Sequence, residues 1–199
     1  MVKHVLARLR RRLKRKVEEL GGRLGELGVR PVHLTVAGLF LSVLAFLSSL
    51  KNSLLYYTIF LAFSGLMDML DGPVARATGK ASPLGAFLDS FVDRVSDVLL
   101  IISLVNFGLD WGFVTSLLVA SLLISYSRAR AESLGVSLEG VGLVERGERI
   151  ILLTATAVLL AVNFTIGFAT FILFLALSLE TVAHRFIYVV QALRDSKPR

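Results

Sequence analysis

Five aspartates occur at helical spacing in a stretch of the chain that is otherwise rich in apolar residues. Asp68 and Asp71 are three residues apart, so on a helix they would share one face. Asp89, Asp93 and Asp97 follow at intervals of four residues and would form a stripe along the next helix. A charged side chain at the centre of a bilayer costs about 2.5–3.5 kcal/mol on insertion scales. These acids must therefore lie near the cytoplasmic surface, face a water-filled cavity or be neutralised by cations.

The segment between the two helices is expected to turn the chain back on itself. Gly72-Pro73 is expected to end the first helix, because glycine tolerates the left-handed cap and proline cannot continue a helix. Residues 77–84 contain glycine, serine and proline, which is typical of a loop. Such a hairpin would point the aspartates at one another. Converging carboxylates without thiolate ligands suit Mg²⁺, Mn²⁺ or Ca²⁺, and several could hold two ions around a transferring phosphoryl group.

Readings of the acids without catalysis stay open at this point. A structural ion-pair network would use Arg76 and Arg94, but two cations cannot balance five acids. A cation or proton pathway is the stronger alternative, because acids inside a membrane mark such pathways. A pathway needs polar steps across the full thickness, however, and beyond the hairpin only Glu180 lies deep in an expected span.

The elements that must position these acids are expected to be membrane-spanning helices. The chain has 199 residues, of which 55% are hydrophobic, and it carries a net charge of +7 and no cysteine. Soluble domains are about 45–50% apolar, so the composition argues against an ordinary soluble enzyme, and thiolate metal sites and disulfides are excluded. Six stretches are long enough to cross a bilayer. The expected spans are residues 32–50, 53–71, 85–108, 111–131, 148–163 and 166–191.

The distribution of lysine and arginine predicts the orientation of these spans. The first 31 residues hold ten of the 22 basic residues, and the later connections alternate between basic and bare. The positive-inside rule then places both termini and the aspartate hairpin in the cytoplasm. The sequence thus predicts an all-α integral membrane protein of the cell membrane. Its expected parts are a basic amphipathic surface helix within 1–31, a six-helix domain over 32–193 and a basic tail over 194–199. Nucleic-acid binding is not expected, since no aromatic platform for bases accompanies the basic run.

The residues from Asp68 to Asp93 resemble the signature of the CDP-alcohol phosphotransferases, D-x2-D-G-x2-A-R-x8-G-x3-D-x3-D. All eight specified positions and every spacing agree. Enzymes of this family transfer a phosphatidyl-type group from a CDP-linked donor to an alcohol and release CMP. The resemblance therefore implies a metal-dependent phospholipid synthase that uses a CDP-lipid, built on either diacylglycerol or archaeol, and that forms a homodimer.

The same resemblance implies roles for individual residues. Four carboxylates would hold two divalent cations, Mg²⁺ or Mn²⁺: Asp68, Asp71, Asp89 and Asp93. Asp93 would also be the catalytic base that deprotonates the acceptor hydroxyl. The CDP-binding residues would be Asp68, Gly72, Arg76 and Gly85. One position departs from the family pattern, because Val32 stands where many relatives have asparagine, whereas the threonine three residues later is kept as Thr35.

The acceptor alcohol is expected to carry a phosphate, because arginine clusters favour phosphate. Five arginines lie on the expected cytoplasmic side: Arg128, Arg130, Arg146, Arg149 and Arg185. Residues 125–132 and 142–149 resemble segments of the branch that uses inositol phosphate and makes phosphatidyl- or archaetidylinositol phosphate. That resemblance implies that Arg128, Arg149 and Arg185 grip the phosphate of myo-inositol phosphate, whereas Arg146 is expected to serve topology. The alternative within the family is a phosphatidylglycerophosphate synthase that uses glycerol 3-phosphate.

Overall fold

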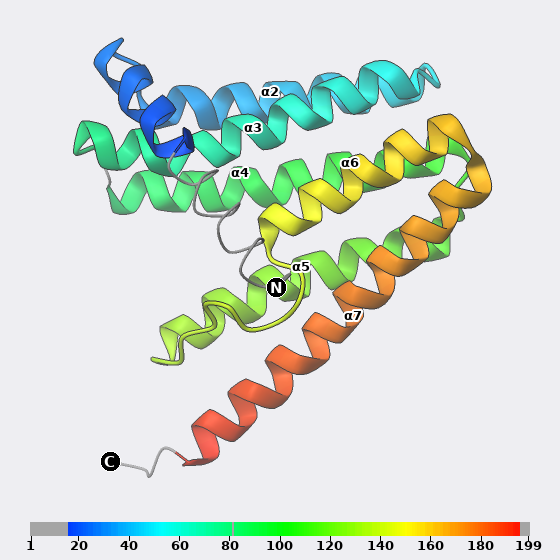
Figure 1. Cartoon of the computed structure of the whole chain (residues 1–199). Helices are drawn as coiled ribbons and strands as arrows, with labels where there is room; N and C mark the ends of the chain where they lie inside the picture. The colour runs from blue at the N-terminus through cyan, green and yellow to red at the C-terminus, as the bar shows by residue number, and fades with distance from the viewer. Residues whose placement is uncertain (1–15, 81, 196–199) are drawn as a thin grey trace, which may run out of the picture.

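The structure, a computed structural model, describes residues 16–80 and 82–195, and within these ranges the chain is helical or in connecting loops (Figure 1). The all-α prediction is therefore confirmed for the described part. A helical segment covers residues 16–26, and η1 is a short 3₁₀ helix. The elements that follow the helical segment are α2 (Pro31–Leu50), α3 (Leu54–Thr78), α4 (Pro83–Ile102), η1 (Ser103–Phe107), α5 (Trp111–Ser133), α6 (Arg146–Val162) and α7 (Phe164–Asp195).

Four of the described helices, α2, α3, α5 and α7, are long and apolar enough to cross a membrane. The other two long helices fall outside that group for clear reasons. Helix α4 carries four charged residues within three turns, and α6 has only 17 residues. The chain is thus an integral membrane protein by the length and composition of four helices, and the count of six spans stays a prediction.

Helix α3 is longer than the sequence suggested. The expectation that Gly72-Pro73 ends it is wrong, because the helix runs through Pro73 to Thr78. It ends at Gly79, whose φ of +63° is the left-handed conformation that glycine adopts without strain. Proline is tolerated within membrane helices where neighbouring elements compensate for the missing hydrogen bond. Here the segment 16–26 covers that point so closely that a Cβ on Gly21 would lie 2.5 Å from the Cβ of Pro73.

Two apolar clusters hold the described helices together. The larger cluster joins α2, α3, α4, α5, α6 and α7 through buried side chains such as Tyr57, Leu100 and Phe174. The smaller one joins α2 to α3 through Leu34, Leu70 and Val74, and the segment 16–26 packs against it. The part of the expected surface helix that precedes residue 16 lies outside the described residues.

The described helices fall into two groups that lie side by side. In Figure 1, α2, α3 and α4 lie alongside one another, while α5 and α7 run together across the other side of the molecule. Helix α6 contacts both α3 and α7 and so links the two parts. The first turn of α6 therefore lies where side chains from α3, α4, α5 and α7 can meet.

Candidate active site

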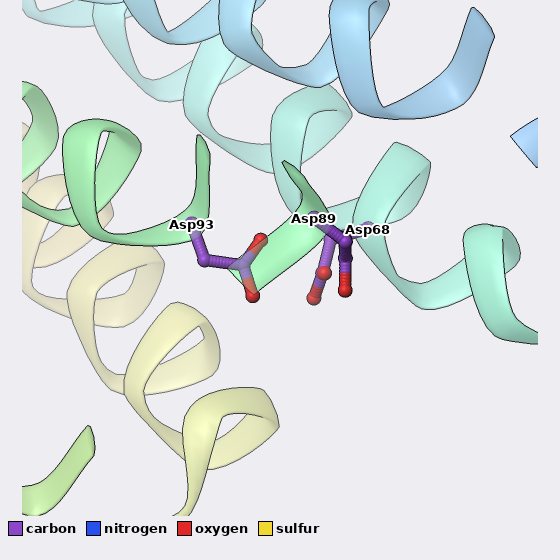
Figure 2. Close-up of side chains that lie close together, drawn as sticks. All are labelled: Asp68, Asp89 and Asp93. Carbon is purple, nitrogen blue, oxygen red and sulfur yellow. The ribbon is translucent and has the colours of Figure 1, made fainter. Parts of the chain in front are cut away.

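Three of the predicted aspartates converge in the structure. Asp68 comes from α3, and Asp89 and Asp93 come from α4, and their side chains point toward one another (Figure 2). One carboxylate oxygen from each lies within 4.8 Å of the other two. Ser82 is the N-cap of α4, and its hydroxyl accepts a hydrogen bond from the backbone N–H of Gly85 at 3.1 Å. This bond stabilises the first turn of the helix. The three-carboxylate cluster has the hard oxygen donors that Mg²⁺ and Mn²⁺ prefer, and it fits a divalent cation.

An arginine already lies within the three-carboxylate cluster. The guanidinium of Arg146, at the first turn of α6, donates to Asp68 and forms an ion pair with Asp93. Arg94 lies farther away, at 3.7 Å from Asp93. The sequence had assigned Arg146 to topology alone, and the structure instead gives it two of the three carboxylates as partners. Its partners lie on helices far away in the chain, so the residues around Arg146 alone do not show this role.

Asp71, the fourth expected metal ligand, lies outside the three-carboxylate cluster. It is 7% exposed, and one of its oxygens accepts the hydroxyl of Thr35 at 2.5 Å. Thr35 belongs to α2, so this hydrogen bond ties the first described long helix to the signature on α3. The retained threonine thus has a partner within the predicted site.

A pocket of about 410 Å³ lies among α2, α3 and α4, and we call it the α2–α4 pocket. Gly72 and Gly85, both expected at the nucleotide, line it together with Asp71 and Asp89. Two cations, Arg30 and Lys80, also line it. Its other lining residues include Val32, Leu84 and Leu88. The pocket thus combines positive charge with apolar walls.

Arg76 is placed differently from the sequence expectation. It does not line the α2–α4 pocket, and its guanidinium pairs with Glu18 of the segment 16–26 at 2.6 Å. The guanidinium also lies over Gly72, where an added Cβ would meet it at 3.2 Å. Asp68 likewise does not line the α2–α4 pocket. Of the four residues expected at the nucleotide, the structure therefore brings two glycines to one pocket.

A second pocket of about 360 Å³ lies on the other side of the aspartates, and we call it the arginine pocket. It gathers all three arginines expected at the acceptor phosphate, together with two more: Arg94, Arg128, Arg146, Arg149 and Arg185. Arg130 is not among the lining residues. Asp93 lines this pocket, and Asp89 lines both this pocket and the α2–α4 pocket. The aspartates thus lie between two pockets of different character.

Comparison with known proteins decides what this arrangement belongs to. The family model of the CDP-alcohol phosphatidyltransferases matches residues 29–191. The chain belongs to this family. The archaetidylinositol phosphate synthase of Pyrococcus horikoshii is 38% identical over 160 residues, which cover 80% of this chain and 85% of that one. The phosphatidylinositol phosphate synthase of Mycobacteroides abscessus is 38% identical over 170 residues, covering 79% and 76%.

Solved structures of the family share the fold. The crystal structure of Mycobacterium tuberculosis phosphatidylinositol phosphate synthase with CDP-DAG bound is similar with a TM-score of 0.73 and 29% identity, covering 88% of this chain and 94% of that one. The structure of the same enzyme with manganese and citrate has a TM-score of 0.73 and 30% identity, covering 87% and 88%. The family signature therefore lies on the same helical scaffold in this chain.

The arginines of this CDP-alcohol phosphatidyltransferase differ in how firmly they are held. Arg149 is 4% exposed and pairs with Asp97 at 3.0 Å, and it also donates to the hydroxyl of Ser125 and the backbone carbonyl of Ser121. Arg185 is 2% exposed and donates to the backbone carbonyls of residues 141 and 124 at 2.9 and 2.8 Å. Arg128, by contrast, has a side chain that is 47% exposed, and it pairs with Glu132 one turn along α5 at 2.9 Å.

The ion-pair partner of Asp97 was not predicted from the sequence. It lies outside the family signature, and the structure makes it the counter-ion of Arg149. A signal was present, because residues 93 and 97 are one turn apart on α4 while residues 146 and 149 are about one turn apart on α6. Two acids and two arginines at similar spacing can form two parallel ion pairs. This pairing can be recognised only after the two helices are known to face each other.

Removing the charge of either Asp97 or Arg149, while the other charge stays, is expected to destabilise the enzyme. Loss of one partner of a buried ion pair costs about 3–5 kcal/mol, because the other charge stays buried without compensation. We therefore expect Asp97→Asn and Arg149→Met each to lower the melting temperature of the purified protein in detergent, measured by circular dichroism. The double variant should recover most of the loss, because no uncompensated charge remains.

The control for this experiment is Asp110→Asn. Asp110 caps α5 by accepting two backbone N–H groups, and asparagine caps about equally well. That variant should melt at nearly the temperature of the unchanged protein. Losses in the single variants that simply add in the double variant would contradict a coupled pair.

Proposed function

We propose that the chain transfers the phosphatidyl-type group of a CDP-lipid to myo-inositol phosphate and releases CMP. The product is phosphatidyl- or archaetidylinositol phosphate, depending on whether the donor is CDP-diacylglycerol or CDP-archaeol. The observation that carries this proposal is the position of the aspartates between two pockets, with Asp89 lining both. The names of the relatives from Pyrococcus horikoshii and Mycobacteroides abscessus support the same acceptor.

The donor is assigned to the α2–α4 pocket. Gly72 and Gly85 leave room for the nucleotide there, and Arg30 and Lys80 supply positive charge for its phosphates. The apolar residues of the pocket are exposed at the surface of the helices, with Leu84 at 68%, so a lipid tail can leave the pocket along them. The relative from Mycobacterium tuberculosis binds CDP-DAG, which supports this assignment.

The three-carboxylate cluster is assigned to divalent cations. Asp68, Asp89 and Asp93 fit one cation, and we propose that Asp71 at the edge of the α2–α4 pocket completes a site for two, Mg²⁺ or Mn²⁺. Such cations neutralise a pyrophosphate and stabilise the departing CMP. The complex of the Mycobacterium tuberculosis relative with manganese supports the use of a divalent metal.

Asp93 is proposed as the base of the reaction. Two members of the three-carboxylate cluster, Asp89 and Asp93, line the arginine pocket, whereas Asp68 does not. Asp89 also lines the α2–α4 pocket, so Asp93 is the member that faces the acceptor side alone. The acceptor hydroxyl oxygen forms a bond to the lipid-side phosphorus, and the bond from that phosphorus to the CMP oxygen breaks. The hydroxyl proton passes to the Asp93 carboxylate, which a weakly nucleophilic alcohol requires.

The acceptor phosphate is assigned to the arginine pocket. Five arginines line it against four carboxylates, two of which belong to the three-carboxylate cluster. Arg128, Arg149 and Arg185 are proposed to bind the phosphate, because guanidinium groups attract phosphate and donate to its oxygens. With Asp89 and Asp93 neutralised by cations, an alcohol without a phosphate would leave five arginines against two carboxylates.

We also propose the surroundings of the enzyme. Both termini and the active site lie on the cytoplasmic side, because the basic residues gather at the N-terminus and at alternate connections. The two helices that carry Asp89, Asp93 and Arg146 complete a set of six spans, and two copies of the chain form a homodimer.

Release of CMP tests the acceptor directly. Purified full-length protein is incubated with a CDP-lipid, Mg²⁺ and either inositol phosphate, glycerol 3-phosphate or no acceptor. We expect CMP only with inositol phosphate and Mg²⁺, and no CMP after chelation of the metal. CMP only with glycerol 3-phosphate would identify a phosphatidylglycerophosphate synthase instead. Ion flux in proteoliposomes, without CMP release from any acceptor, would favour the cation pathway.

Removal of the base is expected to stop turnover and to spare donor binding. Asp93→Asn should lower kcat at least about 100-fold, the usual contribution of general base catalysis. Binding of the CDP-lipid, measured by its dissociation constant, should change little, because asparagine keeps an oxygen for the metal and Asp93 does not line the α2–α4 pocket. Asp110→Asn serves as the matched control with unchanged turnover. An Asp93→Asn variant with more than a tenth of the original kcat would contradict the role of the base.

Arg128 provides a test of the acceptor pocket. Hydrogen bonds to charged groups contribute about 1.5–3 kcal/mol, so Arg128→Gln should raise the KM for inositol phosphate at least about tenfold. The matched control is Arg130→Gln, two residues away on the same helix, which does not line the pocket. Its KM should stay within about twofold of the original. Equal effects in the two variants would show that general surface charge, and not a pocket contact, is measured.

A further inference from the structure

The guanidinium of Arg146 holds the carboxylates that a divalent cation would use. It contacts both Asp68 and Asp93, and these are two of the three members of the three-carboxylate cluster. We propose that Arg146 is a mobile counter-charge. It neutralises the carboxylates before a cation binds, and it moves into the arginine pocket when the cation takes its place. This inference rests on the metal dependence of the proposed function.

The three-carboxylate cluster needs a positively charged partner both before and after a cation binds. Three carboxylates with oxygens within 4.8 Å repel one another strongly, and Asp93 is only 8% exposed. Like charges so close together and so poorly hydrated require a cation nearby. Of the three carboxylates, Arg94 pairs with Asp93 alone, at 3.7 Å, so the bridging contact with two carboxylates belongs to Arg146.

A guanidinium and a metal ion cannot use the same carboxylate oxygens together. An arginine side chain is not deprotonated in proteins, so it cannot lose its charge to make way. It must therefore move. Moving the guanidinium away from the carboxylates costs free energy and so weakens metal binding. Any second ligand that attracts the guanidinium lowers this cost.

The contacts of Arg146 suit such a movement, in contrast to those of Arg149. Arg149 is held by Asp97, by a serine hydroxyl and by a backbone carbonyl. Arg146 contacts only carboxylates among the described residues, with no hydrogen bond to a serine hydroxyl or a backbone carbonyl. Its side chain is 23% exposed and lines the arginine pocket, which offers about 360 Å³ of space. The side chain can thus leave the carboxylates without leaving α6.

A consequence is that the metal and the acceptor phosphate bind cooperatively. An anion in the arginine pocket attracts Arg146 and favours the state in which the carboxylates are free. By linkage, the anion then tightens metal binding, and the metal tightens anion binding by the same factor. Arg146 is thereby a positioning residue that couples the two sides of the aspartates.

Binding of Mn²⁺ alone tests the first part. Purified full-length protein in detergent is titrated with Mn²⁺ and free ion is measured by electron paramagnetic resonance, without any substrate. Arg146→Met keeps the length of the side chain but removes its charge, and should lower the Kd for Mn²⁺ at least tenfold. The matched control Arg94→Met removes a charge that is also near Asp93 and should change the Kd less than threefold. Unchanged or weaker binding in Arg146→Met, or equal tightening in both variants, would overturn the proposal.

Sulfate tests the coupling and avoids the strong complexes that phosphate forms with the metal. At constant ionic strength, sulfate should tighten Mn²⁺ binding about fivefold in the unchanged protein and less than twofold in Arg146→Met, where only the charge of the aspartates couples the two sides. Arg146→Lys is the second variant if the methionine variant does not fold. Lysine is a point charge that does not form the planar bridge, so this variant should bind Mn²⁺ more tightly than the unchanged protein and show a smaller sulfate effect. A sulfate effect of full size in either variant would overturn the coupling.

The outcomes separate this inference from the proposed function. If CMP is released with inositol phosphate while Arg146 variants bind Mn²⁺ as the unchanged protein does, only the mobile counter-charge is wrong. If none of the proteins binds Mn²⁺, the three-carboxylate cluster does not hold a divalent metal, and both proposals fail.

Discussion

Two ion pairs link α4 and α6 at the centre of this molecule, and the buried pair of Asp97 and Arg149 stays in place when Arg146 moves. Arg146 meets Asp93, and about one turn further along both helices Arg149 meets Asp97. Each pair compensates charges that would otherwise be stranded among apolar helices, where an uncompensated charge costs several kcal/mol. The place of α6 against α3 and α4 therefore follows from charge as well as from shape. The two pockets, in turn, depend on that placement, because α6 provides one wall of the arginine pocket.

The remaining arginine of the core extends this arrangement to α7. Arg185 donates to a backbone carbonyl of the loop before α6 and to another at α5, so it joins three parts of the chain. Thr181, one turn earlier on α7, accepts two backbone N–H groups of the same loop. Gly142 lies against Thr181 with a φ of +100°, so a larger residue would be both strained and crowded there. The loop that leads into α6 is thus fixed from α7, and the first turn of α6 is fixed with it.

The family signature predicted the parts of the site that depend on spacing within two adjacent helices. The convergence of Asp68 with Asp89 and Asp93 follows from a hairpin of helices, and the structure confirms it. Contacts between distant segments were beyond such reasoning. The helix continues past Pro73, where the segment 16–26 packs against it, and Arg76 pairs with Glu18, 58 residues earlier. Arg146 similarly finds Asp68, 78 residues earlier.

The net charge of +7 gives little information about the charges that matter at the centre of the molecule. The lining of the arginine pocket is close to balanced, with five arginines against four carboxylates. On the proposed function, divalent cations at the three-carboxylate cluster neutralise Asp89 and Asp93 and shift this balance toward the arginines. The pocket then has the positive charge that a phosphate-bearing alcohol requires, at the moment when the reaction centre is assembled. A site built in this way holds its acceptor best when the metal is present, because the same aspartates that bind the metal otherwise cancel the arginines.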